Sequence, residues 1–136
     1  MTSEGSGTPP VDLPLPRILC DTAELAAGAG DASAGALWRL AESGRQLDAN
    51  VVHLPAEHRV DTHREPELDV LLLVLDGSGT LTAPDGPHAL AGGTLTWLPH
   101  GSTRSIAAGP DGLTYLTVHR RRPGMRIGHG DPAARS

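Results

Sequence analysis

The sequence predicts an all-β protein with one short helix near its start. From residue 36 onward, short runs of strand-forming residues alternate with Gly, Pro and Asp turns at the spacing of a β-sandwich or barrel. Helix signals are confined to residues 22–27. Residues 70–75 read Val-Leu-Leu-Leu-Val-Leu, so both faces of that strand are apolar. We therefore expect the core on one face and a second layer or a second subunit on the other.

The β-type runs are separated by segments with clear turn chemistry. Gly-rich and Pro-rich turns fall at residues 76–79, 84–87, 92–93, 99–101 and 109–112. The strands expected between them are residues 36–41, 47–54, 59–63, 70–75, 80–83, 88–90, 94–98, 104–107 and 113–119.

The helix expected at residues 22–27 has its own start and stop signals. Asp21 and Glu24 have the spacing of a capping box, and Gly28 follows one apolar turn. Residues 1–19 are Gly- and Pro-rich, and we expect a flexible tail there. Residues 123–136 mix Gly, Pro, Arg and Asp, and we expect an irregular C-terminal tail. A chain of 136 residues supplies one core, so one folded domain is predicted over residues 20–122.

Composition and charge disfavour several classes of partner. The 11 basic residues are all Arg and face 16 Asp and Glu, and the net charge of −5 opposes attraction to phosphate backbones and anionic lipid. Aromatic residues make up 2% of the chain, too few for base-stacking platforms. No segment has the length and apolarity of a membrane span, and Cys20 is the single cysteine. We expect a cytoplasmic protein without nucleic-acid or membrane partners.

Gly93, Pro99 and Gly101, together with His63 and Gly77, are spaced as in a pair of known sequence motifs, and on these residues the sequence resembles the cupin superfamily, specifically its small single-domain members. The first cupin motif reads G, five residues, H-x-H, three or four residues, E, six residues, G; the second reads G, five residues, P-x-G, two residues, H, three residues, N. Here Gly93, Pro99 and Gly101 keep the frame of the second motif. Val-Leu-Asp-Gly77 ends the first motif, with His63 in the register of its first ligand histidine. The resemblance covers residues 47–119 and implies a double-stranded β-helix, or jelly-roll barrel.

The metal-ligand positions of these motifs are changed. Counting from His63, Glu65 stands at the second histidine position, Val70 at the glutamate position and Arg104 at the last histidine position. In the family, three imidazoles and one carboxylate hold the metal. A valine donates no lone pair, and a guanidinium stays protonated and repels a dication. We therefore expect a degenerate site with no metal and no other cofactor.

Glu65 and Arg104 are expected to point into one pocket as a charge-assisted pair. The guanidinium then takes roughly the electrostatic place of the missing ion. A second register stays open, in which Asp69 is a carboxylate beside His63 and Glu65 and the three form a metal site. In the family, an acidic pair is common before the strand that corresponds to residues 70–75, and its first acid points outward. Asp69 occupies the position of that first acid.

The other candidates each have a plain structural interpretation. His63 is either a pocket base oriented by Glu65 or the hydrogen-bonded remnant of a lost site. Arg104 either anchors a ligand carboxylate or phosphate or only pairs with Glu65. His53 and His119 lie on strands that the family places in one sheet, so they are candidate neighbours, although a solvated or hydrogen-bonded role is commoner.

The remaining polar and aromatic residues favour structural placements. Trp97 is expected in the core, before the turn at Pro99. The arginines of residues 120–122 are expected to be a solvated strand end. Surface positions are expected for the histidines at strand ends, turns and the tail, namely His58, His88, His100 and His129.

The first functional hypothesis is a metal-free small cupin that binds a small organic ligand, expected to be anionic, through His63, Glu65 and Arg104. A second is a metal-independent epimerase or isomerase with His63 as catalytic base and Glu65 as its partner, although Tyr115 is the only tyrosine and lysine is absent. A third is a metal-dependent dioxygenase or isomerase, and a fourth is a purely structural dimer. Whether the protein is an enzyme is left open. The strand at residues 70–75 predicts a homodimer.

Overall fold

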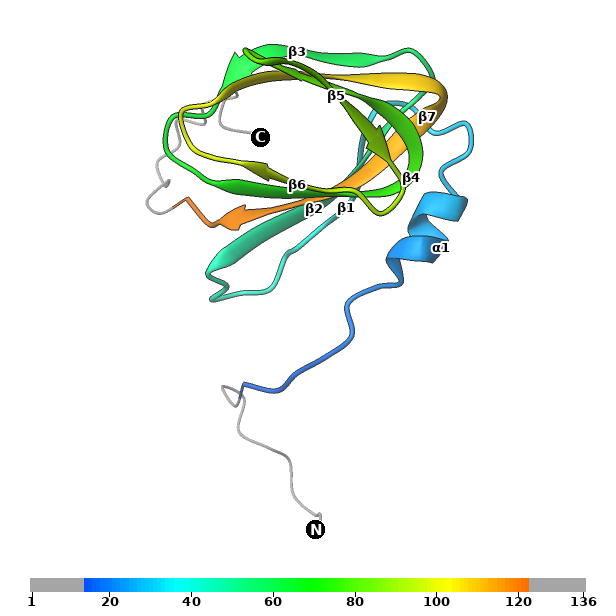
Figure 1. Cartoon of the computed structure of the whole chain (residues 1–136). Helices are drawn as coiled ribbons and strands as arrows, with labels where there is room; N and C mark the ends of the chain where they lie inside the picture. Colours follow the sequence, from blue (N-terminus) through cyan, green and yellow to red (C-terminus); the bar gives the residue numbers. More distant parts are fainter. Residues whose placement is uncertain (1–13, 123–136) are drawn as a thin grey trace, which may run out of the picture.

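The computed structural model describes residues 14–122. In this part of the chain one helix, α1 (Thr22–Ala27), precedes seven strands. The strands are β1 (Gly35–Arg39), β2 (Leu47–Leu54), β3 (Arg59–Arg64), β4 (Val70–Ala83), β5 (Gly86–Ala91), β6 (Leu95–Leu98) and β7 (Thr103–Arg120). They form an antiparallel sheet that curls into a barrel (Figure 1). The predicted all-β class with one short helix is confirmed.

Helix α1 starts and ends where the capping residues predict. A side-chain oxygen of Asp21 accepts hydrogen bonds from the backbone N–H groups of Ala23 at 2.9 Å and Glu24 at 3.1 Å. These bonds satisfy donors of the first turn that have no partner within the helix. Gly28 caps the other end, where its N–H donates to the Glu24 carbonyl. The helix packs against β4 outside the barrel (Figure 1).

Two pairs of predicted strands are single strands in the structure. Residues 70–75 and 80–83 both belong to β4, and residues 104–107 and 113–119 both belong to β7. The prediction of separate strands is wrong because the Gly-rich segments between them do not reverse the chain. They bend it instead, and the β4–β7 register shifts on either side of Gly77. Gly77 and Gly112 have φ angles of 84° and 81°, which glycine adopts without strain.

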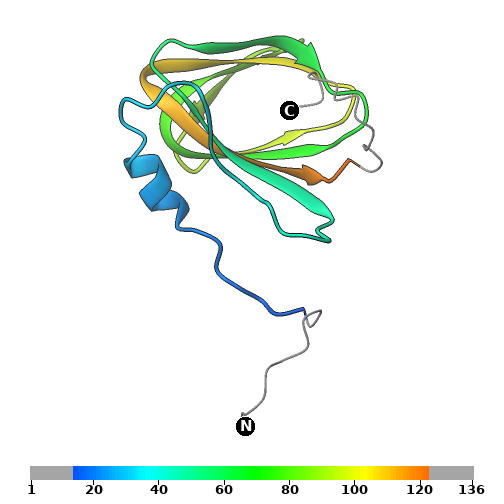
Figure 2. The ribbon, with the colours of Figure 1, turned by 180° about the vertical axis from the view of Figure 1, so that it is seen from behind.

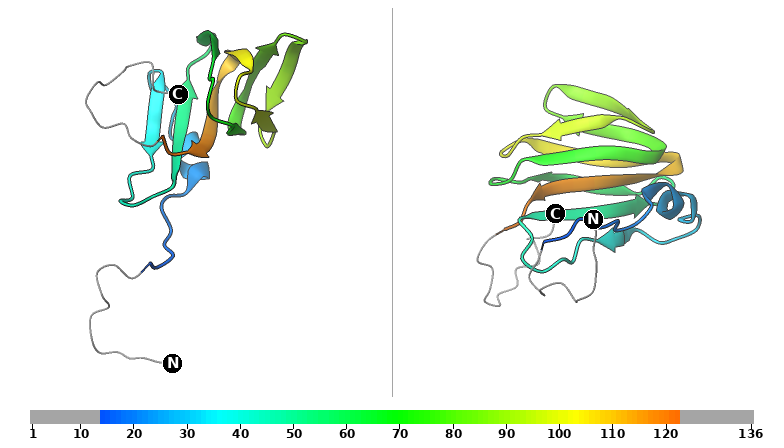
Figure 3. Two further views of the ribbon diagram at one scale, coloured as in Figure 1. Left: turned by 90° about the vertical axis from the view of Figure 1, so that its left-hand side faces the viewer. Right: turned by 90° about the horizontal axis from the view of Figure 1, so that it is seen from below.

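These two long strands connect the two halves of the barrel. The first half of β4 pairs with β6 and with the second half of β7, which continues to β2 and β1. The second half of β4 pairs with β5 and with the first half of β7, which continues to β3. Figures 2 and 3 show this arrangement from behind, from the side and from below.

The core lies between the two halves and consists of alternate strand residues. Leu72 and Val74 of β4 and Leu113 of β7 are almost completely buried, and Tyr115 lies in the same cluster. Its burial raises the pKa of Tyr115 to about 12, so the phenol is neutral at physiological pH. The side chain of Leu71, between two buried neighbours, is 42% exposed, so the strand has an apolar outer face as the sequence predicts.

The predicted tails fall largely outside the described residues, which exclude residues 1–13 and 123–136 and therefore His129. Residues 14–21 have no helix or strand and run away from the barrel (Figures 1 and 2). Over residues 14–122, no helix is long and apolar enough to cross a membrane. The cytoplasmic location stays a prediction.

The closest approach of the two long strands gives a stability prediction. A Cβ atom at Gly77 would lie 2.1 Å from the Gly112 carbonyl oxygen, whereas one at Gly93 would meet no atom within 4 Å. Both glycines have positive φ. We expect Gly77→Ala to lower the free energy of unfolding by about 2–5 kcal/mol, from left-handed strain plus overpacking. The matched control Gly93→Ala should lose only the strain, about 1–2 kcal/mol. Urea unfolding measures both, and equal losses would contradict the steric explanation.

Candidate functional site

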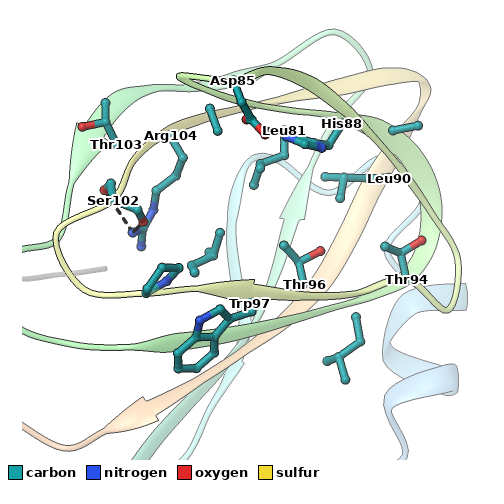
Figure 4. Close-up of a pocket in the computed structure, with 15 residues that line it drawn as sticks. Leu81, Asp85, His88, Leu90, Thr94, Thr96, Trp97, Ser102, Thr103 and Arg104 are labelled. Atoms are coloured by element: carbon teal, nitrogen blue, oxygen red, sulfur yellow. Dashed lines mark hydrogen bonds and ion pairs between the residues drawn. The ribbon is translucent and has the colours of Figure 1, made fainter.

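A pocket of about 410 Å³ lies between β5, β6 and the start of β7 (Figure 4). Its apolar wall contains Leu81, Leu90 and Leu98, which are all buried. The inward phase of β6 adds the hydroxyl of Thr96, because Thr96 and Leu98 alternate with outward residues. The pocket is thus apolar along most of its depth, with a few polar groups that can fix the orientation of a ligand.

Among the described residues that line this pocket, Arg104 supplies the one positive charge that does not depend on pH. Its side chain is 6% exposed and points into the barrel interior (Figure 4). Its Nη1 donates to Ser102 Oγ at 3.1 Å and lies 3.5 Å from the Ser102 carbonyl oxygen. Within residues 14–122 no carboxylate oxygen lies within 4.0 Å of the guanidinium. Burial lowers the pKa of Arg104, and the negative charge of Glu65 opposes part of that effect. Arginine nevertheless stays protonated.

The predicted ion pair between Glu65 and Arg104 is wrong. Glu65 Oε1 accepts instead from Nη2 of Arg122, and Oε2 accepts from the Glu67 backbone N–H at 2.9 Å. The bond from Glu67 is local, whereas the bond from Arg122 arises from tertiary placement, since Arg122 follows β7 and lies near the β3–β4 connection that carries Glu65. The expectation that residues 120–122 are all solvated is therefore also wrong for Arg122, which is half-buried.

Glu65 is held as a carboxylate by these partners. Burial raises the pKa of Glu65, but the hydrogen bonds from Glu67 and Arg122 and the charge of Arg122 together bring it below its usual value. Its negative charge is therefore matched by Arg122. Arg104 is left with Ser102 as its hydrogen-bonding partner among the described residues.

His63 lies near the predicted place but without the predicted partner. It pairs in register with Arg104 across β3 and β7, which puts the two side chains on the same face of the sheet. The imidazole is exposed, and its Nδ1 donates to the Asp61 carbonyl at 3.1 Å. Glu65 does not orient it, because both carboxylate oxygens of Glu65 are hydrogen-bonded elsewhere. The structure therefore does not support His63 as a base positioned by Glu65.

The donor set does not fit the metal that the cupin motifs imply. Val70 is buried at its predicted ligand position and offers no lone pair, and Arg104 brings a positive charge. Asp69 is exposed and accepts at Oδ1 from the His100 backbone N–H at 2.9 Å and from His100 Nδ1 at 2.8 Å. These hydrogen bonds lower the pKa of Asp69. Among the described residues, no three His, Cys, Asp or Glu side chains are grouped to hold a metal ion.

The two strand histidines are not neighbours. His53 pairs in register with Thr114, and His119 pairs with Asp48 near the other end of the same two strands. Nδ1 of buried His53 lies 2.9 Å from Thr114 Oγ1, and Nδ1 of His119 donates to the Arg120 carbonyl at 2.8 Å. Nδ1 of each imidazole thus has a hydrogen-bonding partner, whereas Nε2 of His53 is buried without one among the described residues.

Three features of the site had weak or no signals in the sequence. Trp97 is 57% exposed on the outer side of β6, so its predicted core position is wrong; its pairing with Leu71 puts it on the outward phase. Arg122 and Ser102 have no motif of their own. At the pocket rim, Asp85 and His88 are exposed and their Oδ1 and Nε2 atoms lie 2.9 Å apart, a contact that lowers the pKa of Asp85.

No protein-family model and no curated protein matches the sequence. Solved structures do match the fold. The cupin domain of Cnp3 from Schizosaccharomyces pombe has a TM-score of 0.56 at 17% identity, over 62% of this chain and 63% of that one, which is under two thirds of its length. A cupin protein from Bacteroides fragilis has a TM-score of 0.56 at 20% identity, over 68% and 83%.

KdgF from a Halomonas species gives a TM-score of 0.55 at 21% identity, over 65% of this chain and 81% of that one. Likenesses at such low identity show a shared fold and carry no information on activity. The chain therefore has the fold of the cupin superfamily, as its glycine and proline frame predicts.

Proposed function

We propose that this small cupin-domain protein binds a small organic anion in the pocket that contains Arg104. One observation carries the proposal: a buried guanidinium faces the pocket with only Ser102 as a hydrogen-bonding partner among the described residues. A buried charge without a counter-charge is costly. An anionic ligand supplies that counter-charge, and the planar guanidinium accommodates a carboxylate or phosphate with two parallel hydrogen bonds.

The pairing of Glu65 with Arg122 supports this assignment. If Glu65 bound Arg104 directly, the guanidinium would already be neutralised and the attraction for a ligand anion would be small. Because Arg122 takes the carboxylate of Glu65, Arg104 keeps its donors for another acceptor. The contribution of Glu65 is then to bind Arg122 and so leave Arg104 without a carboxylate partner. Arg104 is the ligand-binding residue of the pair that the sequence predicted.

The pocket walls add the second property of the ligand. The volume of about 410 Å³ is that of a small-molecule site. Leu81, Leu90 and Leu98 favour an apolar body, while Thr96 offers one hydroxyl near it. We infer an amphipathic ligand whose anionic group meets Arg104 and whose apolar part contacts the leucines.

The acid–base hypothesis has less support. His63 shares a face with Arg104 but lacks an orienting carboxylate within residues 14–122, and the only tyrosine lies in the core cluster. The metal-dependent hypothesis lacks a grouped donor set among residues 14–122. Anion binding needs neither feature.

The first prediction concerns Arg104. At constant ionic strength, we expect benzoate and inorganic phosphate to raise the melting temperature of the full chain, and uncharged benzyl alcohol not to do so. Arg104→Met should weaken benzoate binding by at least about tenfold in calorimetry, the equivalent of about 1.4 kcal/mol. Arg59, one of two exposed arginines on β3, provides the control, and Arg59→Gln should bind as the unaltered protein does.

The same variant separates binding from folding. Removing a buried, unneutralised charge should leave the ligand-free protein at least as stable, with a gain of about 1 kcal/mol. Benzoate binding that survives Arg104→Met, or anion binding lost equally in Arg59→Gln, would rule out the assignment.

The second prediction concerns the pH dependence that Glu65 contributes. Its folded pKa lies below the ordinary value of 4.5, so its stabilising contribution is fully present above that value and is lost as the pH falls through the lowered pKa. At pH 7, Glu65→Gln should lower the free energy of unfolding by about 1–3 kcal/mol. The difference should shrink on acidification, because the native carboxylate then becomes protonated.

Glu67→Gln is the matched control, since Glu67 is exposed and donates only its backbone N–H to Glu65. It should follow the unaltered protein at every pH in urea titrations. A Glu65→Gln loss that stayed constant from pH 7 to acid would show that the carboxylate charge is not the stabilising feature.

A further inference from the structure

A second pocket of about 410 Å³ lies between β1, β2 and the end of β7, and we call it the β1–β2 pocket. Its lining shares no residue with the pocket that contains Arg104. Charged and polar side chains from all three strands and from the β1–β2 connection contribute to its wall. They are Arg39, Arg45, Asp48, Asn50, His119 and Arg122.

The polar wall of the β1–β2 pocket follows from the register of β2 with its two neighbours. Asn50 pairs with Arg39 of β1, and Asp48 pairs with His119 of β7. Side chains that pair across strands share a face, and so do residues two apart on one strand. Val52, the next residue on this face of β2, packs against the core cluster. The inner face of β2 therefore changes from apolar in the core to polar at the pocket.

Arg45 is held in place in this pocket by two hydrogen bonds. Its Nε donates to Asp48 Oδ1 at 2.9 Å, and its Nη1 donates to the Glu42 carbonyl at 3.1 Å. These bonds leave other N–H donors of the guanidinium for a further acceptor. A side chain that is already ordered loses less conformational freedom when a ligand binds. Arg45 is thus a preorganised donor.

The arginines of this pocket outnumber the carboxylates that neutralise them. Asp48 pairs with Arg45, and Glu65 pairs with Nη2 of Arg122. Within residues 14–122, no carboxylate oxygen lies within 4.0 Å of the Arg39 guanidinium. The charge of Arg39 is therefore unmatched among these described side chains, although the whole chain has a net charge of −5. A local excess of positive charge in a hollow attracts an anion.

We propose that the β1–β2 pocket binds the phosphoryl group of a small phosphate ester. Arg39, Arg45 and Arg122 belong to β1, to the β1–β2 connection and to the segment after β7, so donors reach the pocket from three different elements. The tetrahedral oxygens of a phosphoryl group accept from several directions, whereas a planar carboxylate is matched by a single guanidinium fork. Asn50, half-buried in the wall, adds an amide donor.

The two pockets differ in their walls and therefore in the rest of the ligand. Buried leucines line the pocket of Arg104, whereas Asn50 and His119 line the β1–β2 pocket. Nδ1 of His119 donates to the Arg120 carbonyl, so the neutral ring has its lone pair at Nε2 and can accept from a ligand N–H or O–H group. We infer that the organic part of the ester is polar. This inference does not depend on the anion site at Arg104.

The test uses the full chain with Arg104→Met, so that the first pocket does not contribute to the signal. In calorimetry at constant ionic strength, methyl phosphate should bind at least about tenfold more tightly than acetate. Adding Arg39→Gln should weaken methyl phosphate binding at least about tenfold. The ligand-free melting temperature should not change, because the Arg39 side chain is exposed.

Arg121→Gln is the matched control. Arg121 is an exposed arginine next to Arg122 in the chain, but it does not line the β1–β2 pocket. The substitution removes the same charge as Arg39→Gln and should leave methyl phosphate binding unchanged. If Arg104→Met does not fold, the comparison is made in the otherwise unaltered chain, where Arg39→Gln should remove one of two binding equivalents and Arg121→Gln neither.

The possible failures of this inference differ from those of the Arg104 proposal. Loss of all methyl phosphate binding in Arg104→Met would overturn the β1–β2 pocket as a site and leave the Arg104 proposal standing. Equal weakening by Arg39→Gln and Arg121→Gln would show charge attraction without a site. Acetate binding as tight as that of methyl phosphate would contradict the phosphoryl assignment. Inorganic phosphate binding about tenfold tighter than methyl phosphate would replace the ester by the free ion.

Discussion

The pairing of β4 with β7 is the constraint on which the barrel depends. Each strand belongs to both halves, and β4 bends at Gly77, where the Gly112 carbonyl oxygen of β7 leaves no room for a Cβ atom. That crossing fixes the register of both halves together, because a shift of one residue would reverse every side chain of a strand. The same strand β7 carries Arg104 near its start and the core residue Tyr115 beyond the bend, so the pocket and the core share one scaffold.

The chemistry of the pocket follows from which arginine, Arg104 or Arg122, forms an ion pair with Glu65. Glu65 binds Arg122, which follows the end of β7, and Arg104 near the start of that strand remains without a carboxylate among the described residues. The cupin motifs that this sequence resembles place a lone-pair donor for a cation at the position of Arg104, which presents a cation instead. The proposed ligand is therefore an anion, because it is the group that complements a guanidinium. In the same proposal, the apolar wall contacts the rest of the ligand.

The outer surface is organised by the same alternation as the interior. Along the first half of β4, buried Leu72 and Val74 alternate with the outward side chains of Leu71 and Leu73. Outward residues of β6 and β7 extend this apolar surface. On β6 the less exposed Thr96 and buried Leu98 alternate with the exposed Leu95 and Trp97, so the barrel interior and this outer surface lie on opposite sides of the strand.

The sequence by itself determined the all-β class, the bounds of α1, the frame of glycines and prolines, and the loss of metal-ligand chemistry at Val70 and Arg104. These depend on local backbone preferences or on the chemistry of single side chains, which spacing reveals. Only the tertiary structure decided that Glu65 binds Arg122, that no carboxylate of the described part of the chain orients His63, and that Trp97 faces outward. The partners of Glu65 and His63 depend on which residues meet across strands that are distant in sequence. The direction of Trp97 depends on which face of the short strand β6 points inward. Local residue spacing encodes neither the long-range contacts nor this inward phase.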